Sequence, residues 1–418
     1  MMATTPGAAE QPPAPSVRPA PRRIVATTDV HSALDRAQAL VSFLGAARAD
    51  ALIVDCGDFF EGSGYYALGG GRAETALLTG LYDAVAPGNH GYRHHLDGDL
   101  HSLTVCANIV DRAGATVFRR LRMSSVAGSS VVLTGVIGEA AFTAIPPGER
   151  AGHYVIDPAR ALTALHAAHR SAGESWVVLS HAGFDHDLAL ARSCPFLDVI
   201  FSGHCHRADC GPVRVGDVTV VKAPDLAAGY AVARPADGAW RAQVGTIPSA
   251  AVSGPAGALA SVLDDVAAVG RLLTRPVGPV RASFGDRCGL LALVAARARR
   301  ETGAAVAMFN ETCLREAPLS SVLLLGDLMS LEPFGNRLTL VHAADPAELA
   351  DYLSRRAGPM ICDPDPPPRR PAAVVTTAYL RDTHLHGHHP VVSSERASAL
   401  GVRDLVRAVL LRSSGSGR

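Results

Sequence analysis

The 418-residue chain has almost no lysine and no excess of either charge. Lys222 is its only lysine, so it contains no Gly-Lys-Ser/Thr phosphate-binding loop, and a catalytic lysine at any other position is excluded. Basic and acidic residues both number 39, which gives a formal net charge of zero. This balance offers no sign of a nucleic-acid partner or of an anionic membrane surface.

Long hydrophobic runs and paired cysteines are also missing. No stretch of about 18 apolar residues, the length of a membrane-spanning helix, occurs in the chain. Residues 1–21 are rich in Ala, Pro and Thr and carry no apolar run of signal-peptide length, so we expect a disordered tail and a cytoplasmic protein. The eight cysteines form no C-x-x-C pair and no disulfide framework, and Cys56 and Cys106 are expected to be small buried hydrophobes.

Five short apolar strands each end in residues that can bind a metal. In open α/β sheets the carboxyl ends of the strands carry the ligand site, so these side chains are expected to meet at one sheet edge. Imidazoles and carboxylates bind first-row transition metals, and the number present exceeds what one ion needs. Two metals that share a bridging carboxylate fit this number. The side chains, in chain order, are Asp29, His31, Asp58, Asn89, His90, His181, His204 and His206.

The motifs around these residues are Asp-x-His, Gly-Asp-x-x-x-Gly, Gly-Asn-His, His-x-Gly and Gly-His-x-His. In this order they resemble the calcineurin-like metallophosphoesterases, and segments 57–63 and 107–109 narrow the resemblance to the 5′-nucleotidase and 2′,3′-cyclic-nucleotide phosphodiesterase branch. The resemblance implies an N-terminal four-layer αββα domain. A smaller C-terminal α/β domain of 5′-nucleotidase type would recognise the substrate. It also implies two divalent metal ions, with Mn, Zn, Fe, Co and Mg as candidates.

The same resemblance assigns roles to the ligands. Two ions clamp a phosphoester and promote in-line attack at phosphorus. His90 would stabilise the transition-state charge or protonate the leaving oxygen. One metal would be bound by Asp29, His31, Asp58 and His206, and the other by Asp58, Asn89, His181 and His204.

One departure from the family concerns His90. Relatives often carry an Asp three residues after this histidine to orient it, whereas here that position is Arg93. We expect Asp97 or Asp99 to orient His90 instead. Cys205 lies between two predicted ligands, but the family pattern treats its position as variable.

Chain length and breaks predict the domain organisation. The metallophosphatase domain is expected over 22–250, with helices at 34–47 and 158–171 between ligand strands. An amphipathic connecting helix is expected within 251–275, and the substrate-recognition domain over 276–412.

The C-terminal half carries a looser resemblance. Segment 330–336 matches a Pro-Phe-x-Asn turn of the family, and 310–315 matches the two ends of an Asn-x-x-x-x-Arg loop without its Gly-rich middle. In relatives the Phe stacks on the nucleobase and the Arg grips the phosphate, although a proline turn can equally place a Phe in the core. The substrate residues predicted in this way are Asn310, Arg315, Phe334, Asn336 and Arg287, with Arg281 as an alternative to the last.

A second departure lies near the C-terminus. Relatives close the base pocket with a Gly-rich loop that carries a second Phe, but after the strand at 373–379 this chain has four histidines within 381–389 and no Phe. A third metal site and a solvent-exposed loop are both open alternatives. We favour a polar pocket wall suited to a modified substrate.

The sequence therefore predicts a hydrolase of phosphoric ester bonds that acts on a small-molecule phosphoester. The expected reaction removes the 5′-phosphate from a nucleoside monophosphate, or from a modified nucleotide in a biosynthetic pathway. The alternatives are a 2′,3′-cyclic-nucleotide phosphodiesterase, a sugar-phosphate phosphatase, and a ligand-binding protein that has lost turnover. The departures at Gly91 and Arg93 favour the last of these, and the intact ligand set opposes it.

Overall fold

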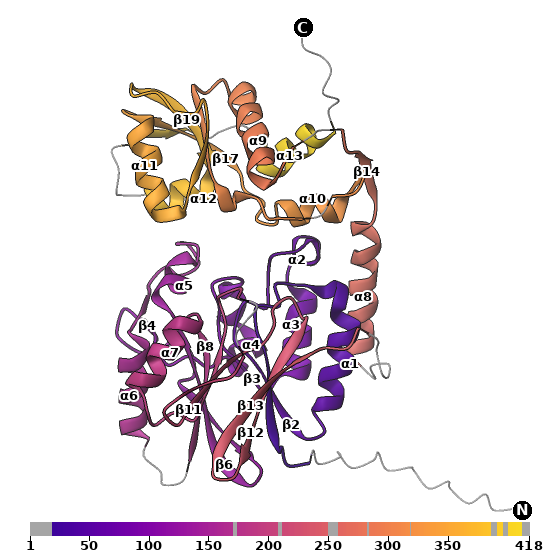
Figure 1. The fold of residues 1–418 in the computed structure, drawn as a ribbon, viewed down its shortest axis with the longest axis vertical. Coiled ribbons are helices and arrows are strands. Elements are labelled where there is room, and N and C mark those ends of the chain that lie inside the picture. Colours follow the sequence, from indigo (N-terminus) through magenta and orange to yellow (C-terminus); the bar gives the residue numbers. More distant parts are fainter. Residues whose placement is uncertain are drawn as a thin grey trace, which may run out of the picture.

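A computed structural model describes residues 19–169, 174–207, 211–249, 258–281, 284–317, 319–385, 391–395 and 400–411 (Figure 1). The predicted tail up to residue 18, the first residues of the predicted connecting segment (251–257), and His386, His388 and His389 lie outside these ranges. Two bodies lie one above the other in Figure 1, and helix α8 (Ala258–Leu273) runs along one side between them. We call residues 19–249 the N-terminal body and residues 276–411 the C-terminal body.

The N-terminal body contains two mixed sheets, each with a parallel part. In the first sheet β1 and β3 both pair with β2 in parallel, and in the second β6, β8, β9 and β11 run parallel. The first sheet has the order β13 (Ala239–Thr246), β12 (Gly229–Ala236), β1 (Arg23–Thr27), β2 (Ala51–Asp55) and β3 (Ala84–Val85). The second has the order β10 (Val213–Val215), β11 (Val218–Lys222), β9 (Val199–Ser202), β8 (Ser175–His181), β6 (Ser129–Ile137) and β5 (Leu121–Val126).

The two sheets pack face to face and helices cover their outer faces. The shared core between the sheets joins β1 and β2 residues such as Ile24 and Val54 to residues of the second sheet such as Leu133 and Phe201. Every residue of β2 is buried, as expected for a parallel strand covered on both faces. The predicted four-layer αββα architecture is thus confirmed. The covering helices are α1 (Ala37–Ala47), α3 (Arg72–Leu81) and α8 on the first sheet, and α6 (Pro158–Ala168) and α7 (Phe184–Ser193) on the second.

The two helices predicted between ligand strands form with shorter bounds. The first begins as a 3₁₀ turn (Leu34–Arg36) that leads into α1. The second, α6, begins at Asp157, whose side chain accepts a hydrogen bond from the Arg160 backbone N–H at 2.8 Å, and Pro158 occupies its first position. It ends at Ala168, before the chain reaches the residues that are not described.

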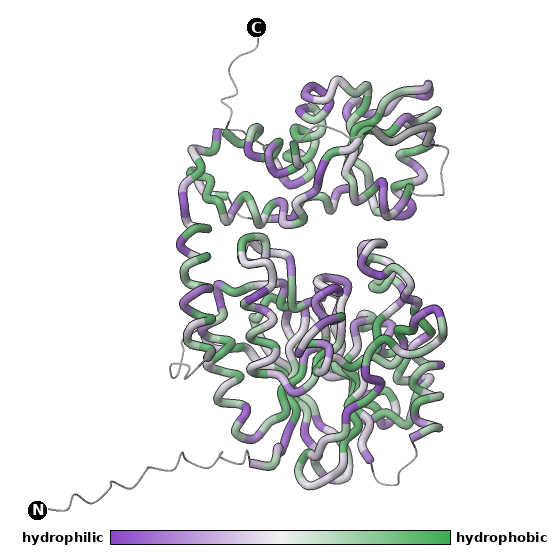
Figure 2. Tube along the Cα trace, turned by 180° about the vertical axis from the view of Figure 1, so that it is seen from behind, coloured by the Kyte–Doolittle hydropathy of each residue, from purple (hydrophilic) through white to green (hydrophobic). Residues whose placement is uncertain are grey.

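The C-terminal body is a smaller α/β unit, as predicted. Its central sheet has helices α9 and α13 packed on one face and α11 on the other. Hydrophobic positions recur along the strands and helices of both bodies (Figure 2). The sheet order is β18 (Met360–Asp363), β15 (Val306–Asn310), β19 (Ala372–Thr377), β17 (Leu338–Ala343) and β20 (Val391–Glu395), and the helices are α9 (Arg287–Thr302), α11 (Pro346–Ala357) and α13 (Val402–Leu410).

Short elements connect the two bodies. Helix α2 (Gly64–Gly69) of the N-terminal body contacts α10 (Leu325–Leu331) of the C-terminal body, and both contact α8. Among the described residues, no helix combines the length and apolar character needed to cross a bilayer. The remaining short elements are α4 (Gly98–Leu103), α5 (Glu139–Ala144), α12 (Ala378–Leu380), the paired strands β4 (Ile109–Asp111) and β7 (His153–Val155), and the paired strands β14 (Pro276–Pro279) and β16 (Val322–Leu324).

Candidate active site

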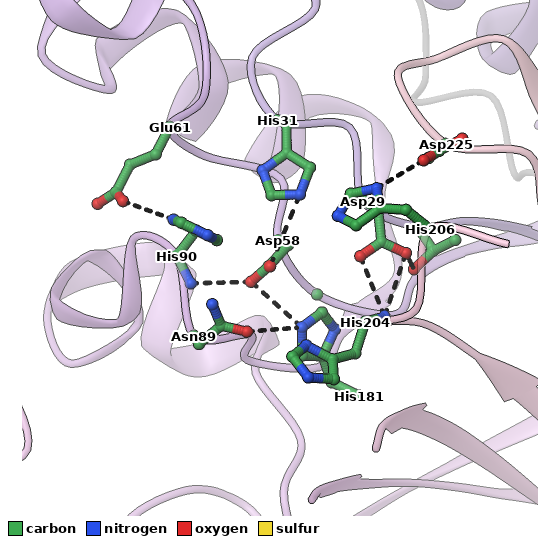
Figure 3. Close-up of polar contacts among 12 residues, drawn as sticks. Asp29, His31, Asp58, Glu61, Asn89, His90, His181, His204, His206 and Asp225 are labelled. Carbon is green, nitrogen blue, oxygen red and sulfur yellow. Dashed lines mark hydrogen bonds and ion pairs between the residues drawn. The ribbon is translucent and has the colours of Figure 1, made fainter. Parts of the chain in front are cut away.

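The strand ends of both sheets converge on one cluster of side chains (Figure 3). The first sheet supplies residues that follow β1, β2 and β3, and the second supplies residues that end β8 and follow β9. The cluster contains three overlapping groups of residues. Within each group, the ligand atoms all lie within 4.8 Å of one another. These groups are Asp29 with His31 and His206, His31 with Asp58 and His90, and Asp58 with His181 and His204.

Asp58 lies between the two halves of the cluster. Its Oδ2 atom is 3.7 Å from His31 Nε2, and its Oδ1 atom is 3.3 Å from His181 Nε2. Asn89 reaches the same side as His181, with its Oδ1 atom 3.3 Å from His181 Nε2. The two carboxylate oxygens thus face different ligand groups, an arrangement compatible with a ligand shared by both.

The loops that hold these ligands have unusual backbone geometry. Asp29, His31, Asp58 and His204 have φ angles of 49°, 48°, 56° and 77°, in the left-handed region that side-chain-bearing residues rarely adopt. Gly88 allows Asp58 to approach, because a Cβ atom at position 88 would lie 1.9 Å from Asp58 Oδ1. Backbone strain of this kind concentrates at functional sites, where the surrounding fold compensates for it.

Further contacts fix the orientation of the ligands. The His181 Nδ1–H donates to the backbone oxygen of Cys56 at 2.8 Å, which orients the ring so that Nε2 points toward Asp58 and Asn89. His206 Nδ1 is 2.6 Å from Asp225 Oδ2. Both oxygens of Asp29 accept the backbone N–H of His204, at 3.0 and 3.2 Å. Such outer contacts are typical of metal ligands.

The electrostatics of the cluster suit a cation. Burial raises the pKa of Asp58, but His181, His90 and His31 outweigh it and hold that pKa well below its usual value. Burial lowers the pKa of His31 well below its usual value, so its imidazole is neutral. Asp58 is therefore charged, and His31 has a nitrogen lone pair available for coordination.

The residues present fit two divalent metal ions. Both ring nitrogens of His31 are buried and have no hydrogen-bond partner among the described residues, which leaves them oriented toward the cluster. Carboxylates, imidazoles and an amide oxygen are ligands for first-row transition metals and for zinc. Cys205 does not join them, because its Sγ atom accepts the backbone N–H of Phe184 at 3.3 Å.

His90 is oriented by a residue that the sequence analysis missed. His90 Nδ1 is 2.9 Å from Glu61 Oε2, and Glu61 Oε1 accepts the backbone N–H of Gly91 at 3.1 Å. The prediction of Asp97 or Asp99 is wrong, because Asp97 precedes α4 as its N-cap and Asp99 lies in its first turn. The available signal was an acidic residue inside the Gly-Asp-x-x-x-Gly motif.

The contact with Glu61 determines which ring nitrogen of His90 is free. Nδ1 donates to Glu61, so Nε2 is the nitrogen left for a substrate. Burial lowers the pKa of His90, but Asp58 and Glu61 outweigh burial and leave that pKa above its usual value. A raised pKa favours the protonated imidazole, which is the form that a general acid needs.

A pocket of about 760 Å³ joins this cluster to the C-terminal body. Asn89 and His90 line one side, and Phe334 and Tyr379 line the other. Both aromatic side chains are exposed, Phe334 at 42% and Tyr379 at 41%, so Phe334 is not a core residue. Tyr379 was not predicted as a site residue, because it lies at the end of a strand pattern with no family motif.

Glu332 shapes the turn that presents Phe334. Its Oε2 and Oε1 atoms accept the backbone N–H groups of Gly335 and Asn336, at 3.0 and 2.8 Å. Arg403 pairs with the Glu332 carboxylate at 3.3 Å, which compensates its buried charge. The ring of Phe334 is therefore held by a buried network rather than by contacts with the core.

The structure brings four of the five predicted substrate residues to this region. Asn310 and Asn336 line the pocket. Arg315 reaches from the C-terminal body to the N-terminal one, where Nη1 would lie 3.0 Å from a Cβ atom on Gly62, and its guanidinium is 5.4 Å from the centre of the Phe334 ring. Arg287 is not among the lining residues and instead pairs with Glu311 at 2.6 Å.

Of the four histidines within 381–389, only His384 lies among the described residues. His384 packs edge-on against Tyr379, with ring centres 5.6 Å apart. Its neighbours Asp382 and Thr383 line the pocket. The predicted polar pocket wall therefore has support at these residues, and the remainder of the segment lies outside the described residues.

Comparison with known proteins identifies the N-terminal body. The model of the calcineurin-like phosphoesterase family matches residues 22–208. Those residues belong to the calcineurin-like phosphoesterases. The resemblance predicted from the motifs is confirmed by this match.

The chain is also similar to 5′-nucleotidases. It is 29% identical over 175 residues to a probable 5′-nucleotidase of Treponema pallidum, and this match covers 39% of the chain and 29% of the relative's length. The chain thus spans less than a third of that curated relative.

Solved structures share the two-body fold. A 5′-nucleotidase precursor of Thermus thermophilus superposes with a TM-score of 0.70 and 19% identity, over 95% of this chain and 98% of that one. A 5′-nucleotidase of Candida albicans gives 0.69 and 12% identity, over 94% and 98%. The sulfate thiohydrolase SoxB of Thermus thermophilus gives 0.70 and 16% identity, over 96% and 95%. At these identities the likeness shows the fold alone.

Proposed function

We propose that this phosphoesterase is a metal-dependent phosphomonoesterase that removes the 5′-phosphate from a nucleoside monophosphate. One observation carries the proposal: a single pocket is lined by Asn89 and His90 of the metal-ligand cluster on one side and by Phe334 and Tyr379 on the other. The volume, about 760 Å³, lies within the range of small-molecule sites. A nucleotide has a phosphate for the first side and a base for the second.

Two divalent cations would be held by the predicted ligands, with Asp58 shared between them. When bound, they would supply Lewis-acid polarisation of the phosphoryl group and of the attacking water. The first set is Asp29, His31, Asp58 and His206, and the second is Asp58, Asn89, His181 and His204.

The chain's own residues bind the phosphate and manage the leaving group. Arg315 extends its guanidinium beside the cluster, where a planar donor fork matches phosphate oxygens. His90 presents Nε2 to the pocket while Glu61 holds Nδ1. Asp58 and Glu61 raise the pKa of His90 above the usual value, which favours the protonated form that would donate a proton to the departing ribose 5′-oxygen.

Phe334 and Tyr379 provide aromatic faces for the base. Stacking of a base on one aromatic side chain contributes about 1–3 kcal/mol and tolerates different bases. Polar groups near these rings, Asp382, Thr383 and Asn336, are available to hydrogen-bond base edges or ribose hydroxyls. Tyr379 would thus offer a second aromatic surface in place of the Phe that this chain lacks after its strand at 373–379.

A modified nucleotide is the second candidate. Arg93 also lines the pocket and is held by a 2.8 Å hydrogen bond from Nη2 to the Tyr66 hydroxyl. A cationic group at this wall favours a substrate that carries an added anionic group. Such selectivity would suit a dedicated biosynthetic step better than general scavenging.

Phosphate release measured with Mn²⁺ over a matched panel tests both candidates. The panel contains nucleoside 5′-monophosphates, 2′,3′-cyclic nucleotides, sugar phosphates and nucleotides with an added carboxylate or phosphate, with the His90→Ala variant as control. We expect the 5′-monophosphates or their modified forms to have the highest kcat/KM. A preference for sugar phosphates or cyclic nucleotides would overturn the proposal. Tight nucleotide binding without release would identify a binding protein.

A further inference from the structure

The only lysine of the chain lies buried behind the metal-ligand cluster. Lys222 is the last residue of β11, opposite Ser202 of β9, the strand that leads to His204. Its side chain is fully buried, with Nζ 3.8 Å from Asp29 Oδ2 and donating to the backbone oxygen of Ala223 at 3.1 Å. The other 38 of the 39 basic residues (39 minus one lysine) are arginines. Position 222 is therefore the one basic position of the chain that carries a lysine.

The Asp29 carboxylate is equally buried. Its Oδ2 atom accepts the Thr28 hydroxyl at 2.7 Å, and its side chain has no exposed surface. A buried carboxylate is strongly destabilising unless a partner charge compensates it. Lys222 supplies such a partner charge through its ion pair with Asp29, and its ammonium is a compact point charge.

The segment that follows Lys222 makes two more contacts with the same ligand group. The backbone N–H of Leu226 donates to the Asp29 backbone oxygen at 2.9 Å, and Asp225 bonds His206 at 2.6 Å. The end of β11 and the turn after it therefore touch two of the ligands proposed for one metal. The contacts described above for the other group come from Cys56 and Asn89 instead.

We propose that Lys222 is a built-in counter-ion that holds Asp29 in its ligand position while the site contains no metal. A bound cation takes over this compensation, so the contribution of Lys222 to stability is largest in the metal-free protein. Lys222 is a positioning residue that acts through Asp29. The inference rests on the proposed metal ligands, and it goes beyond the proposed reaction because it concerns the metal-free state.

Replacing Lys222 with Met keeps the length of the side chain and removes its charge. The full-length variant is purified with Mn²⁺, stripped with a chelator, and its Tm is compared with that of the wild type with and without Mn²⁺. We expect the metal-free Tm to fall by roughly 5 °C or more and the Mn²⁺-loaded Tm to fall by no more than about 1–2 °C. By linkage, calorimetry should show one Mn²⁺ binding on the order of tenfold more tightly to the variant.

Two further variants separate this role from simple packing. Leu133→Ala, in the core between the sheets, is the matched control and should lower the Tm equally with and without Mn²⁺. Asp29→Asn combined with Lys222→Met removes both charges, and its metal-free Tm should recover part of the loss seen for Lys222→Met alone.

The outcomes test the role of Lys222 and the proposed metal ligands separately. Equal losses of Tm in both metal states, weaker or unchanged Mn²⁺ binding, or failure of Lys222→Met to fold even with Mn²⁺ present would each overturn the role of Lys222. A wild-type protein whose Tm does not respond to Mn²⁺ would overturn the proposed ligand set itself. The two failures are therefore distinguishable.

Discussion

The metal-ligand cluster and the substrate pocket are built in different ways. The cluster draws its side chains from the ends of fully buried parallel strands, and its members are held by hydrogen bonds to backbone and by left-handed loop residues. The far wall of the pocket comes from turns of the C-terminal body, whose aromatic rings are about two-fifths exposed. Chemistry is thus placed on the rigid part of the molecule, and recognition is placed on the part that varies easily.

The largest effect is expected at the residue shared by both ligand groups. Asp58→Asn removes the charge that faces His31 and His181. We expect kcat to fall by at least about 10²–10³-fold, and metal content per chain to fall below two. Metal analysis after gel filtration checks this. Two ions retained per chain in the variant would contradict the bridging role of Asp58 and weaken the contrast between the two regions.

The next effect separates proton transfer from metal binding. His90→Ala should lower kcat by about 10²–10⁴-fold, because a positioned general acid is lost, while both metals stay bound. A substrate with a good leaving group, such as a nitrophenyl phosphate, should lose much less. An equal loss on both substrates would argue that His90 serves the metals rather than the leaving group.

A smaller effect is expected at the residue that orients His90. Glu61→Gln should lower kcat by about 10–100-fold with little change in KM, and Glu61→Asp should restore part of it. Because Glu61 helps to raise the pKa of His90, its loss lowers that pKa. A general acid works only below its pKa, so the alkaline limb of the kcat profile should move to lower pH. A change confined to KM would contradict this role.

Substitutions in the pocket wall of the C-terminal body should change KM more than kcat. Phe334→Ala removes one stacking face, worth about 1–3 kcal/mol, and should raise KM for a nucleotide by about 5–150-fold with kcat nearly unchanged. Phe334→Tyr, which keeps the ring, is the matched control. If nitrophenyl phosphate, which has no base, suffers the same rise, the ring stabilises the pocket rather than the base.

The smallest effect is expected at a residue that the motifs suggested and the geometry does not favour. Arg287 pairs with Glu311 and does not line the pocket. Arg287→Ala should change kcat/KM by less than about threefold, as for a partly exposed ion pair away from the substrate. A loss comparable to that of an Arg315→Ala variant would restore Arg287 as a phosphate-binding residue.

The sequence was most informative about candidate ligands that lie close to one another along the chain. Asp29 and His31, Asn89 and His90, and His204 and His206 lie within two residues of each other, so each pair reaches the cluster together. The apolar strands that precede these pairs also indicate that the pairs lie at the carboxyl edge of a sheet. Glu61 and Tyr379 escaped because their roles arise from contacts with partners 29 residues away or in the other body. The motif that contains Glu61 shows an acidic residue, but it does not show that this residue contacts His90.

The sequence by itself indicated the family resemblance and the set of side chains offered to the metals, because short motifs are local properties of a chain. The four-layer order of helices and sheets was implied by that resemblance. Only the tertiary structure decided which carboxylate orients His90, which second aromatic side chain lines the pocket with Phe334, and that the single lysine lies beside Asp29. These pairings depend on how loops from two sheets and two bodies pack at distances of a few ångströms. Such packing is a property of the whole fold and not of any one segment.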